Sequence, residues 1–463
     1  MNRRDFLKQS GTFLSLASLG GMTAALSGLT KSVQAAQVSD YKALVGVFLL
    51  GGMDNHDTII PYDQSTYDRY AQIRSRLLSQ YANNSRARTN LLALSPSNSA
   101  NFSGRSFALP PELSGIHSLF QQGQAAIVGN VGPLLQTTNR QSFEAETAHL
   151  PTRLFSHNDQ QATWMSSSPE GAQYGWGGFF ADALLSNNTS PEFSAITSGG
   201  NELFLTGQHA IPYQVGLGGR VQAFTALENL EEQQGTAQQM QLLKAHFRGD
   251  SSHYSHLIAK DMANKMTASF DSNVRFNQSL TNAPTMSTTF PSNELGQQLQ
   301  AVAKTISIRN ELQAKRQVFL VALGGFDTHS RQARSLPTLH KNMDVAVTAF
   351  QQAMIELGLN DKVTLFTMSD FGRALSINGD GTDHGWGGHQ FVVGGAVKGG
   401  QIYGDLPIAD FNHDQDAGNG RLIPTTSVEQ FAAPLGRWFG LSDSELQTAL
   451  PNLRNFSNTL SFV

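Results

Sequence analysis

Three aspartates follow directly after apolar segments of strand length, a pattern that could build a metal site. The pairs of segment and aspartate are 43–50 with Asp54, 318–323 with Asp327, and 363–368 with Asp370. The carboxyl ends of the strands line the ligand crevice of an open α/β sheet, so we expect the three carboxylates to meet at one edge. Crowded carboxylates repel one another, and a bound divalent cation removes that repulsion. The pattern therefore predicts a metal site at this edge.

Histidines close to these aspartates extend the predicted ligand set. His329 lies two residues after Asp327, and a glycine-rich segment carries His384 and His389. The predicted ligands are Asp54, Asp327, His329, Asp370, His384 and His389. The chain has no cysteine, so thiolate sites are excluded, and the remaining donors suit zinc, manganese or iron, with calcium as an alternative. Taken singly, each aspartate after a strand also fits a turn or helix-cap residue.

A second cluster combines a hydroxyl, an imidazole, a carboxylate and a cation between residues 153 and 159. Ser156 next to a metal could act as a nucleophile, with His157 beside it. Arg153 could hold an anionic substrate through paired hydrogen bonds. The alternative is structural, because Ser156 and Asp159 have the spacing of a helix cap and its capping-box partner. Both interpretations stay open at this stage.

The N-terminus predicts export. Arg3 and Arg4, followed by Phe6, Leu7 and Lys8, match a twin-arginine signal. The uncharged stretch that follows is only mildly hydrophobic, which favours a cleaved signal over a stable membrane anchor. Small residues permit cleavage after Ala35, so we expect a signal peptide at 1–35 and a periplasmic or secreted chain at 36–463. The expected partner is the twin-arginine translocase, which carries folded proteins.

Composition narrows the function further. The 463-residue chain is 15% charged with a formal net charge of −4, and it has no long basic run, so nucleic acid is not an expected partner. Without cysteine there are no disulfides or iron–sulfur clusters. No Gly-x-Ser-x-Gly, phosphate-loop or dinucleotide-binding motif is present, which disfavours serine hydrolases, nucleoside triphosphatases and dinucleotide-dependent oxidoreductases.

Alternating apolar and amphipathic segments predict one α/β domain, with a mostly parallel sheet flanked by helices. Candidate parallel strands lie at 43–50, 125–128, 318–323, 363–368 and 390–393, and helices at 113–122, 294–315 and 336–357. A capping box of Thr426 and Glu429 predicts a further helix that ends at Gly440. The polar stretch 186–293, with a helical pattern from Ala226 to about Met266, is expected to form an insertion covering one sheet edge.

The order of these motifs resembles the bacterial family catalogued as domain of unknown function 1501, over essentially the whole chain after the signal. The motifs are Gly51-Gly52-x-Asp54, Ser156-His157, Gly324-Gly325-Phe326-Asp327-Thr328-His329, Ser369-Asp370-Phe371-Gly372-Arg373 and Asp383-His384-Gly385. That family is similar to the alkaline phosphatase and sulfatase superfamily, which implies an alkaline phosphatase-like fold, metal ligands at strand ends and Ser156 as nucleophile. Two-metal members of the superfamily carry Asp-His where this chain has Asp370-Phe371. The resemblance therefore implies one complete metal site.

Two functions follow from these expectations. The first is an exported metal-dependent hydrolase of small phosphate or sulfate esters, with attack by Ser156 or by a water molecule activated by the metal. The second is a non-catalytic exported binding or assembly protein that retains the fold, with or without a structural metal. Replacement of Ser156 separates them, because only the hydrolase would lose its function.

Overall fold

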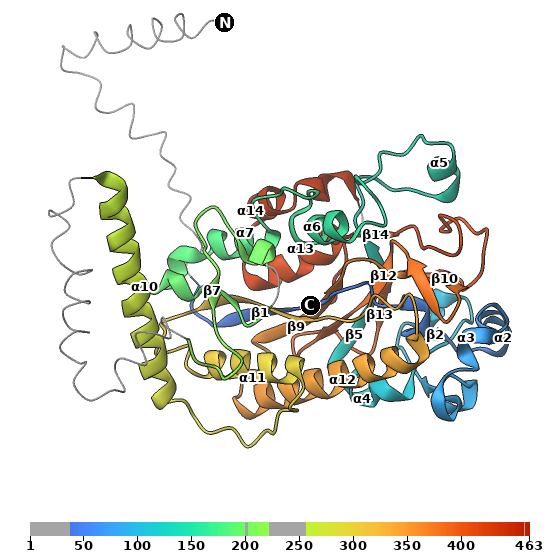
Figure 1. Cartoon of the computed structure of the whole chain (residues 1–463), viewed down its shortest axis with the longest axis horizontal. Coiled ribbons are helices and arrows are strands. Elements are labelled where there is room, and N and C mark those ends of the chain that lie inside the picture. The colour runs from blue at the N-terminus through green and yellow to red at the C-terminus, as the bar shows by residue number, and fades with distance from the viewer. Residues whose placement is uncertain (1–37, 200–201, 222–255, 458) are drawn as a thin grey trace, which may run out of the picture. The chain divides into compact units, whose positions relative to one another are not determined.

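The computed structural model describes residues 38–199, 202–221, 256–457 and 459–463. The predicted signal peptide, its cleavage site and residues 226–255 of the helical pattern lie outside these residues. The described chain forms a large β-sheet with helices on both faces (Figure 1). The predicted α/β class, with a mostly parallel sheet flanked by helices, is confirmed.

The main sheet has the order β13-β5-β12-β9-β1-β8-β6-β7, and β14 pairs with β5. Its strands are β1 (Lys42–Leu49), β5 (Ala125–Gly132), β6 (Ala195–Thr197), β7 (Tyr213–Gln214), β8 (Arg316–Leu323), β9 (Val363–Ser369), β12 (Gly388–Val393), β13 (Ile402–Gly404) and β14 (Thr426–Ser427). The central strand β1 runs parallel to both β8 and β9, with Leu49 opposite Leu323 and Ser369. The three strands therefore end at one edge, as the sequence predicts.

Each face of the sheet packs against its own helical layer (Figure 1). Alternate residues of β1 enter the two cores, with Val45 and Val47 on one side and Leu44 and Phe48 on the other. One layer holds α4 (Ser114–Gln121), α11 (Glu294–Ser307) and α12 (Gln332–Glu356). The other holds α6 (His157–Ser166), α7 (Trp176–Ala183), α13 (Val428–Phe439) and α14 (Asp443–Ala449). Burial on both faces explains why the central strands are continuous apolar runs.

Further helices and strands lie outside the main sheet and its two helical layers. They are α2 (Gln64–Ile73), α3 (Ser75–Leu78), α5 (Arg140–Glu144), α10 (Leu257–Thr281), a hairpin of β10 (Arg373–Asn378) and β11 (Gly381–His384), and a small sheet of β2 (Ile60–Pro61), β3 (Leu92–Ala93) and β4 (Phe107–Leu109). A short 3-10 helix, η1 (Asn55–Asp57), follows β1. Among the described residues, no helix is both long and apolar enough to cross a bilayer.

One predicted strand has the wrong direction. The segment 390–393 was expected to be parallel, but β12 runs antiparallel to both of its neighbours, β9 and β5. The chain passes from β9 to β12 through the β10–β11 hairpin and no helix. A parallel return needs a long crossover, usually a helix, so this connection reverses the strand.

Two helix ends also differ from the prediction. The capping box of α13 uses Ser427 and Gln430, one residue later than Thr426 and Glu429, because Thr426 pairs with Val131 as part of β14. Helix α11 ends at Ser307 rather than at 315, and turns at 308–313 lead into β8. The predicted end of α13 at Gly440 is correct, and this glycine has a left-handed φ of 122°.

The predicted insertion at 186–293 contributes strands to the main sheet. It supplies β6, which pairs with β8, and β7 at the outer edge. The described part of its helical pattern is α10. This segment therefore extends the sheet on the side opposite to β5 and β12.

Candidate metal centre

The loops after β1, β8 and β9 meet closely because Gly51 lies between them. Gly51 has φ +113°, and a Cβ placed on it would lie 2.3 Å from the backbone nitrogen of Asp327. Its own N–H donates to Asp370 Oδ1 at 3.1 Å. A residue without a side chain is therefore required at this position. The same contacts bring the aspartates of two different loops to one place.

Four side chains converge above this meeting point: His157, Asp327, His329 and His384. The Nε2 atoms of His329 and His384 lie 2.8 Å apart, and Asp327 Oδ1 lies 3.1 Å and 3.2 Å from them, respectively. His157 Nε2 lies 3.5 Å from Asp327 Oδ2. Donor atoms of His157, Asp327 and His384 all fall within 4.8 Å of one another. We refer to these four residues as the histidine–aspartate cluster.

Each histidine of the cluster is oriented through its other ring nitrogen. Nδ1 of His157 lies 2.6 Å from Asp370 Oδ2, and Nδ1 of His384 lies 2.8 Å from the carbonyl oxygen of Phe155. Nδ1 of His329 lies 3.3 Å from Asp383 Oδ1. Carbonyl and carboxylate oxygens only accept hydrogen bonds, so each Nδ1 carries a proton, and the Nε2 of a neutral imidazole in this orientation presents its lone pair to the cluster. Metal-bound histidines are held in the same way.

This geometry fits a divalent cation. Two imidazole Nε2 atoms 2.8 Å apart beside a carboxylate need either a proton on one of them or a cation between them. Ligand atoms of a tetrahedral zinc ion lie roughly 3.3 Å apart, close to the separations within the cluster. The side chains of the cluster are 24% to 45% exposed, which leaves one side open to solvent, as in catalytic sites. His157, Asp327, His329 and His384 are thus the residues that could hold the ion.

Asp370, which was predicted to be a ligand, orients the site from behind. It is fully buried, and its Oδ2 accepts from both His157 Nδ1 and Gln161 Nε2, the latter at 2.7 Å. Its Oδ1 accepts from the N–H of Gly51. The hydrogen bond with Asp370 raises the pKa of His157 above its ordinary value. Asp370 therefore fixes His157 instead of facing the centre of the cluster.

Arg373 neutralises part of the charge of Asp327. Its Nη1 donates to Asp327 Oδ1 at 2.7 Å and to the carbonyl of Gly51 at 3.0 Å. Burial alone would raise the pKa of Asp327, but Arg373, together with the nearby histidines, holds that pKa below its usual value. Burial lowers the pKa of His384, and the neighbouring charges of His157 and Arg373 lower it further. Asp327 is thus ionised and His384 neutral near pH 7, as metal ligation requires.

Asp54 lies outside the cluster, in a buried ion pair. Its Oδ2 accepts from Arg74 Nη1 at 2.7 Å and from Gln332 Nε2 at 2.6 Å, and both charged side chains are 0% exposed. Its Oδ1 accepts from the N–H of His56 and caps η1. This predicted ligand is therefore fully engaged in holding the loop after β1.

His389 also lies outside the cluster. Its Nδ1 accepts from the N–H of Asn130 at 3.0 Å, and its side chain is buried within the sheet. Burial lowers the pKa of His389 to about 3. His389 therefore connects β12 to β5.

Ser156 occupies the N-cap position of α6, immediately before His157. Its hydroxyl donates to Asp159 Oδ2 at 3.0 Å and makes no side-chain bond to the backbone of the first turn. Arg153 is 68% exposed and lies 3.8 Å from the carboxylates of Asp159 and Glu170. Ser156 is the N-cap, as the structural alternative predicts, but it forms no capping box with Asp159, and a nucleophilic role for Ser156 stays a prediction.

The family model for proteins of unknown function called DUF1501 matches residues 41–450. This chain belongs to that family. No match was found among curated proteins. The predicted resemblance to domain of unknown function 1501 is therefore confirmed.

Solved structures with distant similarity to this DUF1501 chain include a sulfatase and an alkaline phosphatase. Ps i-CgsB in complex with k-i-k-neocarrahexaose is 10% identical with a TM-score of 0.34, and the match covers 88% of this chain and 74% of the other. The PsFucS1 sulfatase from Pseudoalteromonas sp. is 11% identical with a TM-score of 0.34, covering 89% and 70%. A mutant of the alkaline phosphatase PafA is 10% identical with a TM-score of 0.26, covering 73% and 64%. The assignment of the metal centre rests on the side chains described above.

Several residues that build the site of this DUF1501 protein were not predicted. His157 was expected to act in catalysis, but its Nε2 faces Asp327 and could bind the ion. The helical spacing of His157 and Gln161 was a usable signal, because side chains four residues apart share one helix face and both contact Asp370. No local signal indicated that the Phe155 carbonyl would orient His384.

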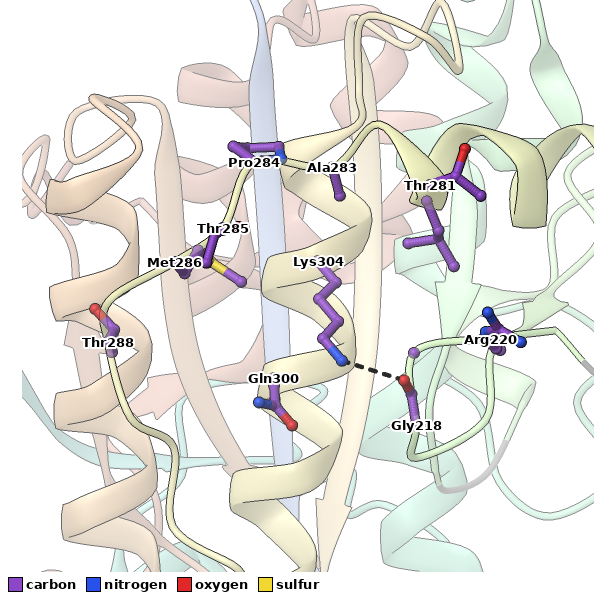
Figure 2. A pocket seen from close by; sticks show the side chains of 12 residues that line it. Gly218, Arg220, Thr281, Ala283, Pro284, Thr285, Met286, Thr288, Gln300 and Lys304 are labelled. Atoms are coloured by element: carbon purple, nitrogen blue, oxygen red, sulfur yellow. Dashed lines mark hydrogen bonds between the residues drawn. The ribbon is translucent and has the colours of Figure 1, made fainter.

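A separate cavity of about 370 Å³ lies between the end of α10, the following loop, α11 and residues 218–220 (Figure 2). Lys304 Nζ donates across it to the carbonyl of Gly218 at 3.3 Å. Lys304 and Arg220 line the cavity, and none of its described lining residues is a carboxylate. None of the residues of the histidine–aspartate cluster belongs to it.

Proposed function

We propose that this protein is a metal-dependent hydrolase that acts on phosphate or sulfate esters. The observation that carries the proposal is the convergence of three imidazole Nε2 atoms on the Asp327 carboxylate, with every Nδ1 facing an oxygen acceptor. Such second-sphere contacts fix the orientation of metal ligands. A divalent ion held there would stabilise negative charge on the ester oxygens during attack. The class of ester follows from the family resemblance.

Residues around the cluster hold its side chains in position in this proposal. Asp370 and Gln161 keep His157 aimed at Asp327. Arg373 keeps Asp327 ionised and ties it to the carbonyl of Gly51, so the carboxylate holds its place when substrate binds. These contacts join the loops after β1, β8 and β9 to α6. Preorganised charge of this kind lowers the barrier because little reorganisation is needed during the reaction.

Ser156 is the nucleophile in this proposal. It precedes His157, and the N-terminus of α6 favours an anion beside it. Its hydroxyl already donates to Asp159, so this carboxylate can take the proton as the oxygen attacks the phosphorus or sulfur atom. The bond to the ester oxygen breaks, the alcohol leaves, and water then hydrolyses the ester formed on Ser156. We expect Ser156→Ala to lose turnover while binding the metal normally. Full turnover in that variant would point to attack by water instead.

We also propose export by the twin-arginine translocase, with cleavage after Ala35. The support is the Arg3-Arg4 pair and the weakly hydrophobic stretch behind it. Replacing both arginines with lysines is expected to leave an uncleaved precursor inside the cell. N-terminal sequencing of the exported protein would identify the cleavage site, and export of the double-lysine protein at the normal rate would contradict the proposal.

A turnover assay tests the hydrolase directly. The mature protein would be stripped with a chelator, reloaded with zinc, manganese, iron or calcium, and assayed on a panel of phosphate and sulfate esters. We expect turnover with at least one ion and a loss of roughly 100-fold or more in His384→Ala. His209→Ala is the matched control, because His209 is exposed and lies outside the cluster. A protein that binds the ion but hydrolyses no ester would instead be the exported binding protein.

A further inference from the structure

The arginines near the histidine–aspartate cluster differ in what they already bind. Arg373 is buried, and its guanidinium donates to Asp327, to Gly51 and to both the hydroxyl and the carbonyl of Thr382. Arg153 is exposed and faces two carboxylates, those of Asp159 and Glu170. The guanidinium of Arg373 is therefore fully engaged, whereas an anion bound by Arg153 would compete with two carboxylates 3.8 Å away.

Unlike Arg153, Arg421 bonds to the backbone of a cluster residue, and it also interacts with the carboxylate of Asp383. Its Nε donates to the carbonyl oxygen of His384 at 2.8 Å, so the side chain lies against a residue of the cluster. Its guanidinium carbon lies 5.1 Å from the ring centroid of Phe155, the residue whose carbonyl holds His384 Nδ1. Among the described residues, neither terminal nitrogen of Arg421 has a hydrogen-bond partner. Its side chain is half-buried, so these nitrogens remain accessible.

The backbone holds Arg421 in place. Asp416 Oδ1 accepts from the N–H groups of Gly418 and Gly420 at 2.8 Å and 2.9 Å, which closes the loop before Arg421. The N–H of Arg421 donates to the carbonyl of Gly418, and its carbonyl accepts from the N–H of Ala417. With Nε and the ring face both in use, the guanidinium has little freedom. A fixed guanidinium with two free nitrogens matches the spacing of two oxygens of a tetrahedral anion.

We propose that Arg421 binds the oxyanion of the substrate, donating from its terminal nitrogens to two non-bridging oxygens of a phosphate or sulfate group. This inference deepens the proposed function and takes its substrate class from it. It assigns to Arg421 the role that the sequence suggested for Arg153. The two arginines therefore form a natural pair for a test.

The test measures equilibrium binding and not turnover. Zinc-loaded protein, freed of excess zinc, would be titrated with inorganic phosphate and, separately, with sulfate by calorimetry. We expect Arg421→Gln to weaken binding of the preferred anion by roughly 10- to 100-fold, the range for one hydrogen-bonded charged contact. Arg421→Lys keeps the charge but loses the fork, so we expect an intermediate loss. Arg153→Gln should change binding less than threefold.

Metal content separates binding from positioning, because the Nε contact touches His384. Arg421→Gln is expected to keep the zinc stoichiometry of the wild type. Loss of zinc in parallel with loss of phosphate would overturn the inference and make Arg421 a positioning residue for His384. Unchanged anion binding in Arg421→Gln, or a larger effect of Arg153→Gln, would also overturn it. Anion binding through Arg421 without ester turnover would support this inference while contradicting the hydrolase.

Discussion

The buried pair of Asp54 and Arg74 allows a quantitative test of how the loop after β1 is held. Arg74 donates to Asp54, to the carbonyl of Leu375 and to the carbonyl of Ala374, and it is 0% exposed. Arg74→Met keeps a long apolar side chain but leaves the buried carboxylate without its cation. Breaking a buried ion pair on one side costs about 3–5 kcal/mol. This is a large part of the total stability of a typical protein, about 5–15 kcal/mol.

Urea denaturation followed by circular dichroism would measure this change in the free energy of unfolding. Arg69→Met is the matched control, because Arg69 pairs with Asp410 at 2.8 Å with side chains 44% and 33% exposed. Exposed pairs contribute at most about 1 kcal/mol. The double variant Asp54→Asn/Arg74→Met should be more stable than Arg74→Met alone, because the uncompensated charge is gone. A loss below about 1 kcal/mol in Arg74→Met would show that the buried ion pair does not hold this loop.

The stability that the pair of Asp54 and Arg74 contributes should also depend on pH. Burial alone would raise the pKa of Asp54, but Arg74 holds that pKa below its ordinary value. The contribution of the pair is therefore complete above the unfolded-state pKa, about 3.9, and is lost as the pH falls through the folded-state value. The difference between the wild type and Arg74→Met should shrink at strongly acidic pH.

Three further predictions concern other parts of the fold. Burial lowers the pKa of His56, His340 and His389 to about 3, so below about pH 6.5 the unfolded chain binds more protons than the folded chain. The free energy of unfolding should therefore decrease as the pH falls, by up to about 1.4 kcal/mol per pH unit for each histidine. Denaturation at several pH values between about 4 and 7 would measure this decrease. Gly51→Ala should cost roughly 1–3 kcal/mol and weaken zinc binding, because its Cβ meets the Asp327 backbone; normal affinity would contradict this. Ser427→Ala removes the α13 cap and should cost about 1 kcal/mol, whereas Thr426→Ala should not lose a cap.

The sequence predicted the elements of the sheet well because their signal is local. Continuous apolar segments identify strands buried on both faces, and β1, β5, β8, β9 and β12 all lie where the sequence placed them. The direction of β12 depends on whether a helix lies in the connection, which an apolar run does not reveal. The start of α13 was also not predictable locally, because Thr426 pairs with the distant residue Val131.

The metal site was predictable only in part, because equal local patterns have different long-range partners. Asp54 and Asp327 both follow a strand and a pair of glycines. Asp54 meets the buried Arg74 and Gln332, whereas Asp327 meets three imidazoles. His384 and His389 belong to the same glycine-rich segment. His384 ends β11 and reaches the cluster, whereas His389 lies within β12 and bonds to β5.

Elemental analysis of the natively folded protein would show whether the histidine–aspartate cluster holds a metal. We expect about one equivalent of a divalent ion, lost in His329→Ala and His384→Ala. We also expect that Asp54→Asn, although less stable, keeps the ion, and that His209→Ala is unchanged. A native protein without a divalent ion, or an ion retained in both histidine variants, would contradict the assignment of the histidine–aspartate cluster as a metal centre.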